Sequence, residues 1–322
     1  GARRPAQGRP HRHPGRVPDP VRESAVAALP LGHHGRLAGR RHARPPPRRR
    51  GPMTGAGPFA APDPLGDEWL ERGYVIRDVA DASAHEWIVT TTARVAAEVL
   101  GTAAPAGLAA SIAYMDAIHE RVTPAALNDV RVRVIHGINA LPELRPAYLA
   151  VARPYLEAIV GNELAMQQRV NLSIQMPADT SSLLPVHADT WSGDSPYEVV
   201  AWLPLVHCYG TKAMYLLPPR HAAAFDADFA RRAGSSSESA FDAMRDQVEW
   251  LEVRSGQVLV FDQSLPHGNR VNDESETRWS MNCRFKGVFT PYGDKKLGEF
   301  FEPITLRPAT RRGMGYRLPS VR

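Results

Sequence analysis

The order of local patterns along the chain is the feature that most constrains its fold. Between residues 67 and 161, apolar residues recur at steps of three and four, which is the spacing of an amphipathic helix. From residue 169 the segments are short, rich in β-branched and aromatic residues, and bounded by Pro, Gly, Asp or Ser. One insertion, 221 to 250, has a helical pattern. Helices followed by a run of strands predict an α+β protein whose β half is a sandwich or a barrel-like jelly roll.

Capping residues and prolines predict where the helices begin and end. Ser83 and Glu86 match the S-x-x-E capping box at a helix start. The Thr-Pro pair at 123–124 matches an N-cap followed by proline in the first turn. A further helical stretch ends at Gly161, and we expect Pro154 to interrupt it because proline has no N–H to donate within the helix.

Composition excludes several classes of protein. The hydrophobic share of 43% and the charged share of 23% are those of an ordinary globular protein. Cys208 and Cys283 are the only cysteines, so a disulfide framework is excluded and a cytoplasmic location is expected. No stretch approaches the roughly 18 to 20 apolar residues that cross a membrane, so no membrane association is expected.

The basic charge of the chain is concentrated in its first 52 residues. This segment has thirteen Arg, no Lys, and only Asp19 and Glu23 as acids, so its formal charge is +11. The net charge of the whole chain is +5, which leaves −6 on the remaining 270 residues. Residues 1–52 are interpreted either as a disordered basic arm or as a non-native leader ahead of Met53, with no part in the fold. The acidic body argues against nucleic acid as a partner.

His187 and Asp189 suggest a metal site. In an extended segment, residues two apart point to the same face, so this histidine and this carboxylate lie side by side. A buried-strand pattern, 256–262, leads to His267, 78 residues after Asp189. Two histidines and one carboxylate leave three coordination positions open, as in the non-haem Fe(II) oxygenases. A zinc hydrolase would need only one open position, and a magnesium site would favour more carboxylates and water.

The strand pattern RWSMNCRF, 278–285, suggests a receptor for a carboxylate. Alternation places Arg278, Ser280, Asn282 and Arg284 on one face. The guanidinium of Arg278 can bind both oxygens of a carboxylate, and the hydroxyl of Ser280 can donate to one of them. The distal carboxylate of 2-oxoglutarate requires such a receptor. Arg284, on the same face, is the alternative.

Several motifs together resemble the Fe(II)/2-oxoglutarate oxygenases, specifically the phytanoyl-hydroxylase-like branch. They are EWLERGYVI, HAD, GQVLVFDQSLPHG and Arg278, within a similarity that extends from about Asp67 to Pro303. Three longer stretches resemble oxygenases of bacterial carbohydrate-antibiotic clusters, including those that form orthoesters in hygromycin-type aminoglycosides and orthosomycins. They are LPVHADTWSGDSPYEVVAWLPLV, TKAMYLLP and HGNRVNDESETRWSMNCRFKGVFTPYGDK.

The resemblance implies a fold, a set of cofactors and a reaction. The expected fold is a double-stranded β-helix with a helical N-terminal half, and the expected cofactors are Fe(II), 2-oxoglutarate and O2. We expect one oxygenase domain, 53–322, with its helical part at 67–161, its β-helix core at 169–291 and a C-terminal extension at 292–322. The expected reaction is oxidative cyclisation of an aminoglycoside or oligosaccharide precursor to an orthoester.

Five further residues are weaker candidates for binding. Trp191 and Trp202 could stack on a sugar ring, although aromatic residues in strands often belong to the core. Asp194 could contact a polar substrate, or could be an ordinary turn residue in SGDSP. Gln175 and Lys212 could point into the barrel and contact the cosubstrate or the substrate.

Other functions remain open at this point. One is a simple hydroxylase of a sugar-containing metabolite, and another is a non-catalytic jelly-roll protein that binds sugars. A halogenase of the same fold needs room for halide at the iron, and the carboxylate of Asp189 fills that place. A degenerate binding protein would lack a ligand or the arginine, whereas His187, Asp189, His267 and Arg278 are all present. The expected partner is a small carbohydrate, and the sequence does not indicate an oligomeric state.

Overall fold

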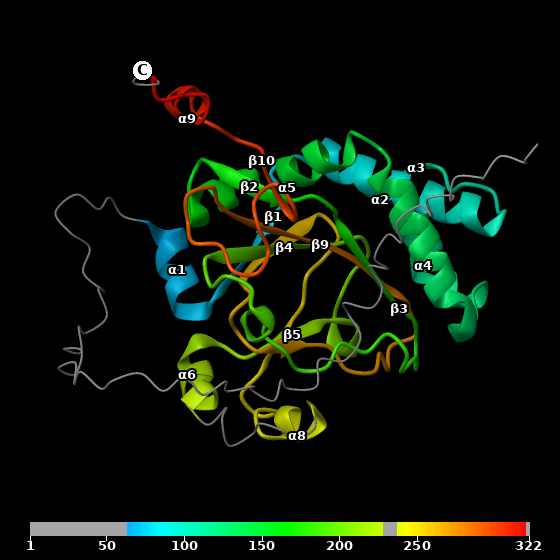
Figure 1. Ribbon diagram of the computed structural model, residues 1–322. Helices are drawn as coiled ribbons and strands as arrows, with labels where there is room; N and C mark the ends of the chain where they lie inside the picture. The colour runs from blue at the N-terminus through cyan, green and yellow to red at the C-terminus, as the bar shows by residue number, and fades with distance from the viewer. Residues whose placement is uncertain (1–62, 228–236, 320–322) are drawn as a thin grey trace, which may run out of the picture.

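The computed structural model describes residues 63–227 and 237–319, and these form a mixed fold of helices and antiparallel sheet (Figure 1). This arrangement confirms the predicted α+β class. The predictions for residues 1–52 lie outside the described residues. The helices and 3-10 turns are α1 (Pro64–Arg72), α2 (Ala82–Leu100), α3 (Gly107–Asp116), η2 (Ile118–Glu120), α4 (Pro124–Asn139), α5 (Leu144–Val160), η3 (Asp189–Ser192), η4 (Gly210–Lys212), α6 (Pro219–Ala227), α8 (Ser237–Asp242) and α9 (Pro308–Met314).

The strands form two antiparallel sheets. The larger has the order β1-β7-β4-β9-β2-β10, with β3 also paired to β9, and the smaller has the order β6-β5-β8. The strands are β1 (Tyr74–Asp78), β2 (Leu164–Gln167), β3 (Asn171–Gln175), β4 (Glu198–Pro204), β5 (Met214–Leu216), β6 (Glu249–Leu251), β7 (Gln257–Asp262), β8 (His267–Gly268), β9 (Arg278–Gly287) and β10 (Phe301–Pro303). The edge strand β10 comes from the predicted C-terminal extension and pairs with β2.

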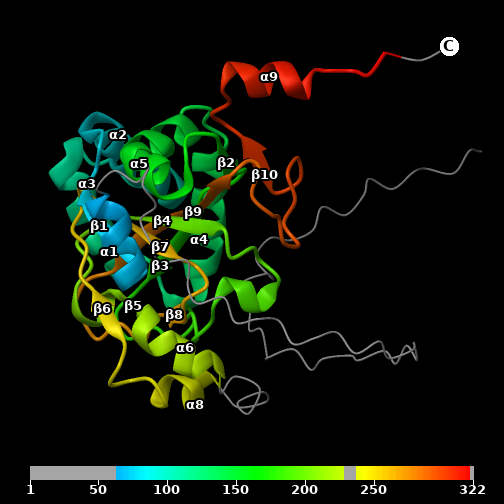
Figure 2. The ribbon, with the colours of Figure 1, turned by 90° about the vertical axis from the view of Figure 1, so that its left-hand side faces the viewer.

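Helices α2 to α5 lie together on one side of the larger sheet, and the main apolar core is between them (Figures 1 and 2). Helix α5 packs on β4, β7 and β9, and the hydroxyl of Tyr148 donates to the carbonyl of Ala201 at 3.0 Å. The helix continues through Pro154, so the predicted interruption is wrong. Large apolar side chains are worth about 1.5–3 kcal/mol each when fully buried. Burial of Tyr148, Val151 and Leu156 therefore offsets the cost of about 3 kcal/mol for an interior proline.

The start of α2 also differs from the predicted capping box. Asp81 is the N-cap, and its side chain accepts a hydrogen bond from the backbone N–H of Ala84 at 2.9 Å. Ser83 therefore lies inside the first turn of the helix. A carboxylate and a hydroxyl two residues apart are both good caps, and the chain uses the earlier one.

Strand β9 sets the two environments of the larger sheet. Trp279, Met281, Cys283 and Phe285 are fully buried on its helix side. The opposite face carries Arg278, Ser280, Asn282 and Arg284, as the alternation predicted, and continues to Lys286. This polar face lies toward the smaller sheet, because the guanidinium of Arg278 reaches the carbonyl of Ala213 just before β5. Polar side chains are thus collected between the two sheets, where the site described next is found.

Within the described residues, no helix is long and apolar enough to cross a membrane.

Candidate metal centre

Backbone pairing brings the three predicted metal ligands together. His187 and His267 form a two-way bridge, with N–H to carbonyl distances of 3.0 and 2.8 Å, which extends the smaller sheet beside β8. Asp189 opens the 3-10 turn η3, and its N–H donates to the carbonyl of Gln263 at 3.0 Å. One ligand atom from each of the three side chains lies within 4.8 Å of those from the other two. These contacts place two imidazoles and one carboxylate around a common point.

The hydrogen bonds of the two histidines suit them to bind a metal. Nδ1 of His187 donates to the carbonyl of Pro185 at 2.8 Å, and Nδ1 of His267 donates to that of Leu265 at 2.8 Å. A carbonyl only accepts, so each Nδ1 carries the proton and each Nε2 presents its lone pair. Burial, together with the neighbouring His187, lowers the pKa of His267 to about 3, so this ring is neutral at physiological pH.

Asp189 supplies the negative charge of the site. Burial alone would raise its pKa, but Arg284, His267 and His187 outweigh that effect and lower the pKa to about 2. The carboxylate is therefore ionised, and its Oδ1 lies 3.8 Å from Nε2 of His187. Two imidazoles and one carboxylate are a donor set that suits Fe(II) and leaves open positions. The residues present fit the predicted metal.

Arg278 is a buried cation that lacks a counterion. It is 4% exposed, and its two terminal nitrogens donate over 3.4 Å to the carbonyl of Ala213 and to the hydroxyl of Ser173. Its Nε and the hydroxyl oxygen of Ser280 are buried without a hydrogen-bond partner. In the part of the chain that the structure describes, no carboxylate pairs with Arg278. Burial lowers its pKa to about 10, which still leaves it charged at neutral pH.

A buried cation without an anion is unfavourable unless a ligand completes it. A carboxylate placed beside Arg278 would neutralise the guanidinium and would also accept from the hydroxyl of Ser280. The binding of 2-oxoglutarate suggested for Arg278 and Ser280 stays a prediction. Arg284, the alternative receptor, is already paired, with its Nη2 at 2.9 Å from Oδ2 of Asp189 and its Nε at 3.6 Å from Oδ2 of Asp194.

Gln175 and Lys212 are both buried and bonded within the protein. The amide of Gln175 donates to the carbonyl of Arg270 at 2.6 Å. Nζ of Lys212 lies 2.7 Å from a carboxylate oxygen of Asp116 and 2.8 Å from one of Glu276. The contacts with cosubstrate or substrate suggested for these two residues stay predictions.

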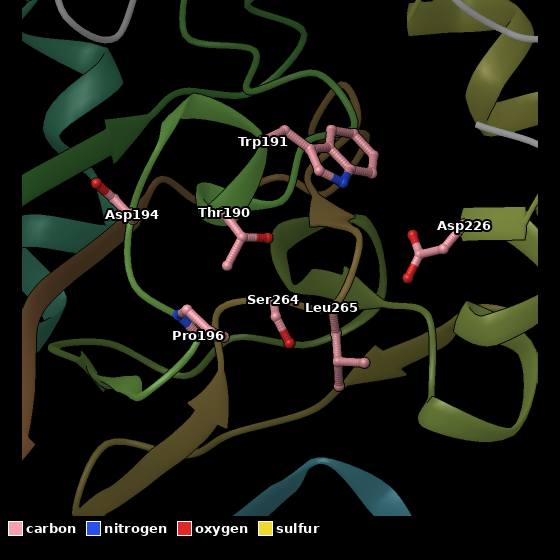
Figure 3. A pocket seen from close by; sticks show the side chains of 7 residues that line it. All are labelled: Thr190, Trp191, Asp194, Pro196, Asp226, Ser264 and Leu265. Atoms are coloured by element: carbon pink, nitrogen blue, oxygen red, sulfur yellow. The ribbon is translucent and has the colours of Figure 1, made fainter. Parts of the chain in front are cut away.

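A cavity of about 460 Å³ is lined in part by residues close in sequence to two of the metal ligands (Figure 3). Thr190, which follows the ligand Asp189, and Leu265, two residues before the ligand His267, both line it. The remaining lining residues are Trp191, Asp194, Pro196, Asp226 and Ser264. None of the three metal ligands is itself among these lining residues.

The three residues suggested for substrate binding differ in how they are placed relative to this cavity. Trp191 lines it and stacks on Phe225, with ring centroids 6.1 Å apart. The carboxylate of Asp194 is directed away from Trp191 in Figure 3, and its Oδ2 lies 2.8 Å from Nζ of Lys295. Trp202 is 6% exposed and belongs to the apolar core. The substrate contacts suggested for these three residues stay predictions.

Sequence reasoning missed Asp226, which extends from α6 toward the same space as Trp191 and Ser264 (Figure 3). Burial raises the pKa of its carboxyl group. Asp226 lies in the insertion at 221–250, and no motif marks it. Only the packing of α6 places this carboxylate beside the cavity.

No family model matches the chain, and no curated protein matches it. Solved structures do match. HygX from Streptomyces hygroscopicus, with nickel and 2-oxoglutarate bound, is 13% identical over 74% of this chain and 91% of that chain, with a TM-score of 0.45. The non-heme alpha ketoglutarate dependent carbocyclase SnoK from nogalamycin biosynthesis is 17% identical over 76% and 97%, with a TM-score of 0.46. The non-heme monooxygenase ThoJ, as a nickel complex, is 15% identical over 76% and 85%, with a TM-score of 0.44.

Because identity and TM-score are low, the function below is built on the side chains of this chain.

Proposed function

We propose that this chain is a non-haem Fe(II)- and 2-oxoglutarate-dependent oxygenase with a double-stranded β-helix core. The observation that carries the proposal is one arrangement between the two sheets. Three ligand atoms from His187, Asp189 and His267 converge there, and the same interior holds the buried, unpaired guanidinium of Arg278. A module that only binds sugar has no need of either feature.

One set of residues would bind the metal, and a second set would bind the cosubstrate. Nε2 of each histidine and Oδ1 of Asp189 would hold Fe(II), which, when bound, supplies the activation of O2 at the expense of 2-oxoglutarate. Arg278 and Ser280 would hold the distal carboxylate of 2-oxoglutarate and fix its orientation. Burial of Arg278 excludes water from that contact, which strengthens the ion pair.

The cavity shown in Figure 3 supports a polar, ring-containing substrate. Trp191 offers a flat surface on which a sugar ring can stack, and Asp226 offers a carboxylate for an ammonium or hydroxyl group. The charge of −6 on residues 53–322 favours the approach of a polycation. The substrate class we propose is therefore an aminoglycoside or related oligosaccharide antibiotic precursor.

The reaction we propose is oxidation at a carbon next to a ring oxygen, followed by closure of a neighbouring hydroxyl onto that carbon to give an orthoester. The substrate loses two hydrogens and 2-oxoglutarate becomes succinate and CO2. One atom of O2 enters succinate and the other leaves as water. Closure requires the hydroxyl to be held against the oxidised carbon, which is a matter of positioning. A simple hydroxylation is the second candidate, since the same site would serve it.

The test uses purified protein, Fe(II), 2-oxoglutarate and ¹⁸O2, with a panel of aminoglycoside precursors. Substrate-stimulated O2 uptake, absent in His187→Ala, is the expected result. A product two hydrogens lighter and without label supports orthoester closure, whereas a product one labelled oxygen heavier supports hydroxylation. A wild-type protein that binds neither Fe(II) nor 2-oxoglutarate would refute the oxygenase assignment.

A further inference from the structure

The carboxylate of Asp189 has its two oxygens in different environments. Oδ1 faces the histidines, 3.8 Å from Nε2 of His187. Oδ2 faces Arg284, whose Nη2 lies at 2.9 Å and whose Nε lies at 3.3 Å. Charge-assisted bonds of this kind are about twice as strong as neutral ones. The side chain of Asp189 therefore presents one oxygen to a metal and keeps the other on the arginine.

Arg284 has further partners besides Asp189. Its Nε donates to Oε1 of Gln263 at 3.0 Å and lies 3.6 Å from Oδ2 of Asp194. Asp194 has a second partner, because its Oδ2 lies 2.8 Å from Nζ of Lys295. Arginine stays protonated in proteins, so the charge of Arg284 does not depend on these partners. The guanidinium is a permanent cation in a fixed position.

Gln263 contacts both Asp189 and Arg284. Its carbonyl accepts from the N–H of Asp189 at 3.0 Å, and its side-chain oxygen accepts from Arg284. Its Nε2 donates to the carbonyl of Ser195 at 3.1 Å and to Oε2 of Glu198 at 2.9 Å. Because the carbonyl of Ser195 only accepts, Nε2 must face it, and the orientation of the amide is settled. Gln263 is fully buried, so no solvent competes for these bonds.

We infer that Arg284, fixed by Gln263 and Asp194, is a positioning residue that restricts Asp189 to a single ligand oxygen. This inference rests on the oxygenase function proposed above. A carboxylate that bound the metal through both oxygens would occupy one of the positions needed by 2-oxoglutarate or O2. Arg284 prevents this by keeping Oδ2 on its own nitrogens. Arg278 binds the cosubstrate and Arg284 supports the metal ligand, so the two arginines of one strand face have separate tasks.

The experiment compares wild type, Arg284→Met and Gln263→Met, each loaded with Co(II) and free of 2-oxoglutarate. The ligand-field absorption spectrum of Co(II) reports the number and geometry of its ligands. Arg77→Met is the matched control, because Arg77 also pairs with a carboxylate, that of Glu68, but forms no contact with the metal ligands. We expect altered spectra for both site variants and an unchanged spectrum for the control. Gln263→Met removes no charge, so it carries the test if Arg284→Met does not fold.

Two further measurements complete the test. Activity with Fe(II) should fall by about 10- to 100-fold in Arg284→Met, the usual effect of losing a group that orients a metal ligand. A Co(II) spectrum identical to that of wild type, with a loss of 2-oxoglutarate affinity alone, would overturn the inference and make Arg284 a cosubstrate receptor. If wild type shows no oxygenase activity while the Co(II) spectra still differ, the proposed function fails and the positioning role stands.

Discussion

At the scale of single residues, the site depends on the Nε2 atoms of two histidines. These nitrogens are left for a metal because each Nδ1 donates to a backbone carbonyl. Removing one imidazole leaves only two protein ligands, which hold Fe(II) poorly. We therefore expect His267→Ala to lose metal binding, measured by calorimetry, and to reduce turnover to background. His207→Ala is the control, because His207 is half-buried, pairs with Glu252 and is not one of the three grouped ligands. Full activity in His267→Ala would show that the centre is misassigned.

Arg278 gives a second prediction at this scale. Arg278→Leu removes a buried cation, so the proposed bond to the distal carboxylate of 2-oxoglutarate is lost. A hydrogen bond to a charged group contributes about 1.5–3 kcal/mol, so the KM for 2-oxoglutarate should rise by about 10- to 150-fold. The KM for the carbohydrate should change far less. Ser280→Ala should shift the cosubstrate constant in the same direction by a smaller factor, and an unchanged constant in Arg278→Leu would contradict the assignment.

At the scale of elements, the start of α2 distinguishes two candidate caps. Asp81→Ala removes the carboxylate that accepts from the N–H of Ala84, and loss of an N-cap costs about 1 kcal/mol. Ser83→Ala should change stability little, because Ser83 lies inside the helix. Urea unfolding of both variants measures the difference. A larger loss for Ser83→Ala would support the capping box instead.

The turn η4 depends on a buried ion pair. Nζ of Lys212 lies between Asp116 and Glu276, and Lys212 is fully buried. Burial raises the pKa of Asp116 even with Lys212 present. Lys212→Met leaves that carboxylate without its cation, which lowers the free energy of unfolding by about 3–5 kcal/mol at neutral pH. Lowering the pH protonates Asp116, so the loss should shrink as the pH falls, and Lys296→Met should show neither effect. A loss independent of pH would contradict this account.

The pKa shifts of this cluster set the direction in which wild-type stability changes with pH. Burial alone would lower the pKa of Lys212, but Asp116 and Glu276 outweigh it and raise the pKa. The contribution of Lys212 to stability is therefore complete below its unfolded pKa of about 10.4 and is lost as pH rises through the higher folded value. The pKa of Glu276 is lowered by its bond to Lys212, so its contribution is lost as pH falls through that depressed value.

At the scale of the whole molecule, some features follow from local sequence patterns and others depend on tertiary contacts. The alternation in β9 and the order of helices before strands were readable because each depends on residues close in sequence. The continuity of α5 through Pro154 could not be predicted in this way, because burial of the helix against the sheet overrides the local propensity of proline. His187 and His267 were nominated by residue type and spacing. The pairing of Arg284 with Asp189 joins residues 95 positions apart, so no local pattern encodes it. Asp226 reaches the cavity only because of where α6 is placed, which no local pattern encodes either.

The backbone bridge between His187 and His267 couples metal occupancy to global stability. Only the folded chain places these two rings side by side, so a metal that binds there binds the native state and not the unfolded one. By mass action, free metal at 100 times its dissociation constant adds about 2.7 kcal/mol to the free energy of unfolding. The melting temperature should therefore rise with the logarithm of Co(II) concentration in wild type and stay flat in His267→Ala. A thermal melt thus becomes a binding assay, and it reports affinity without any substrate.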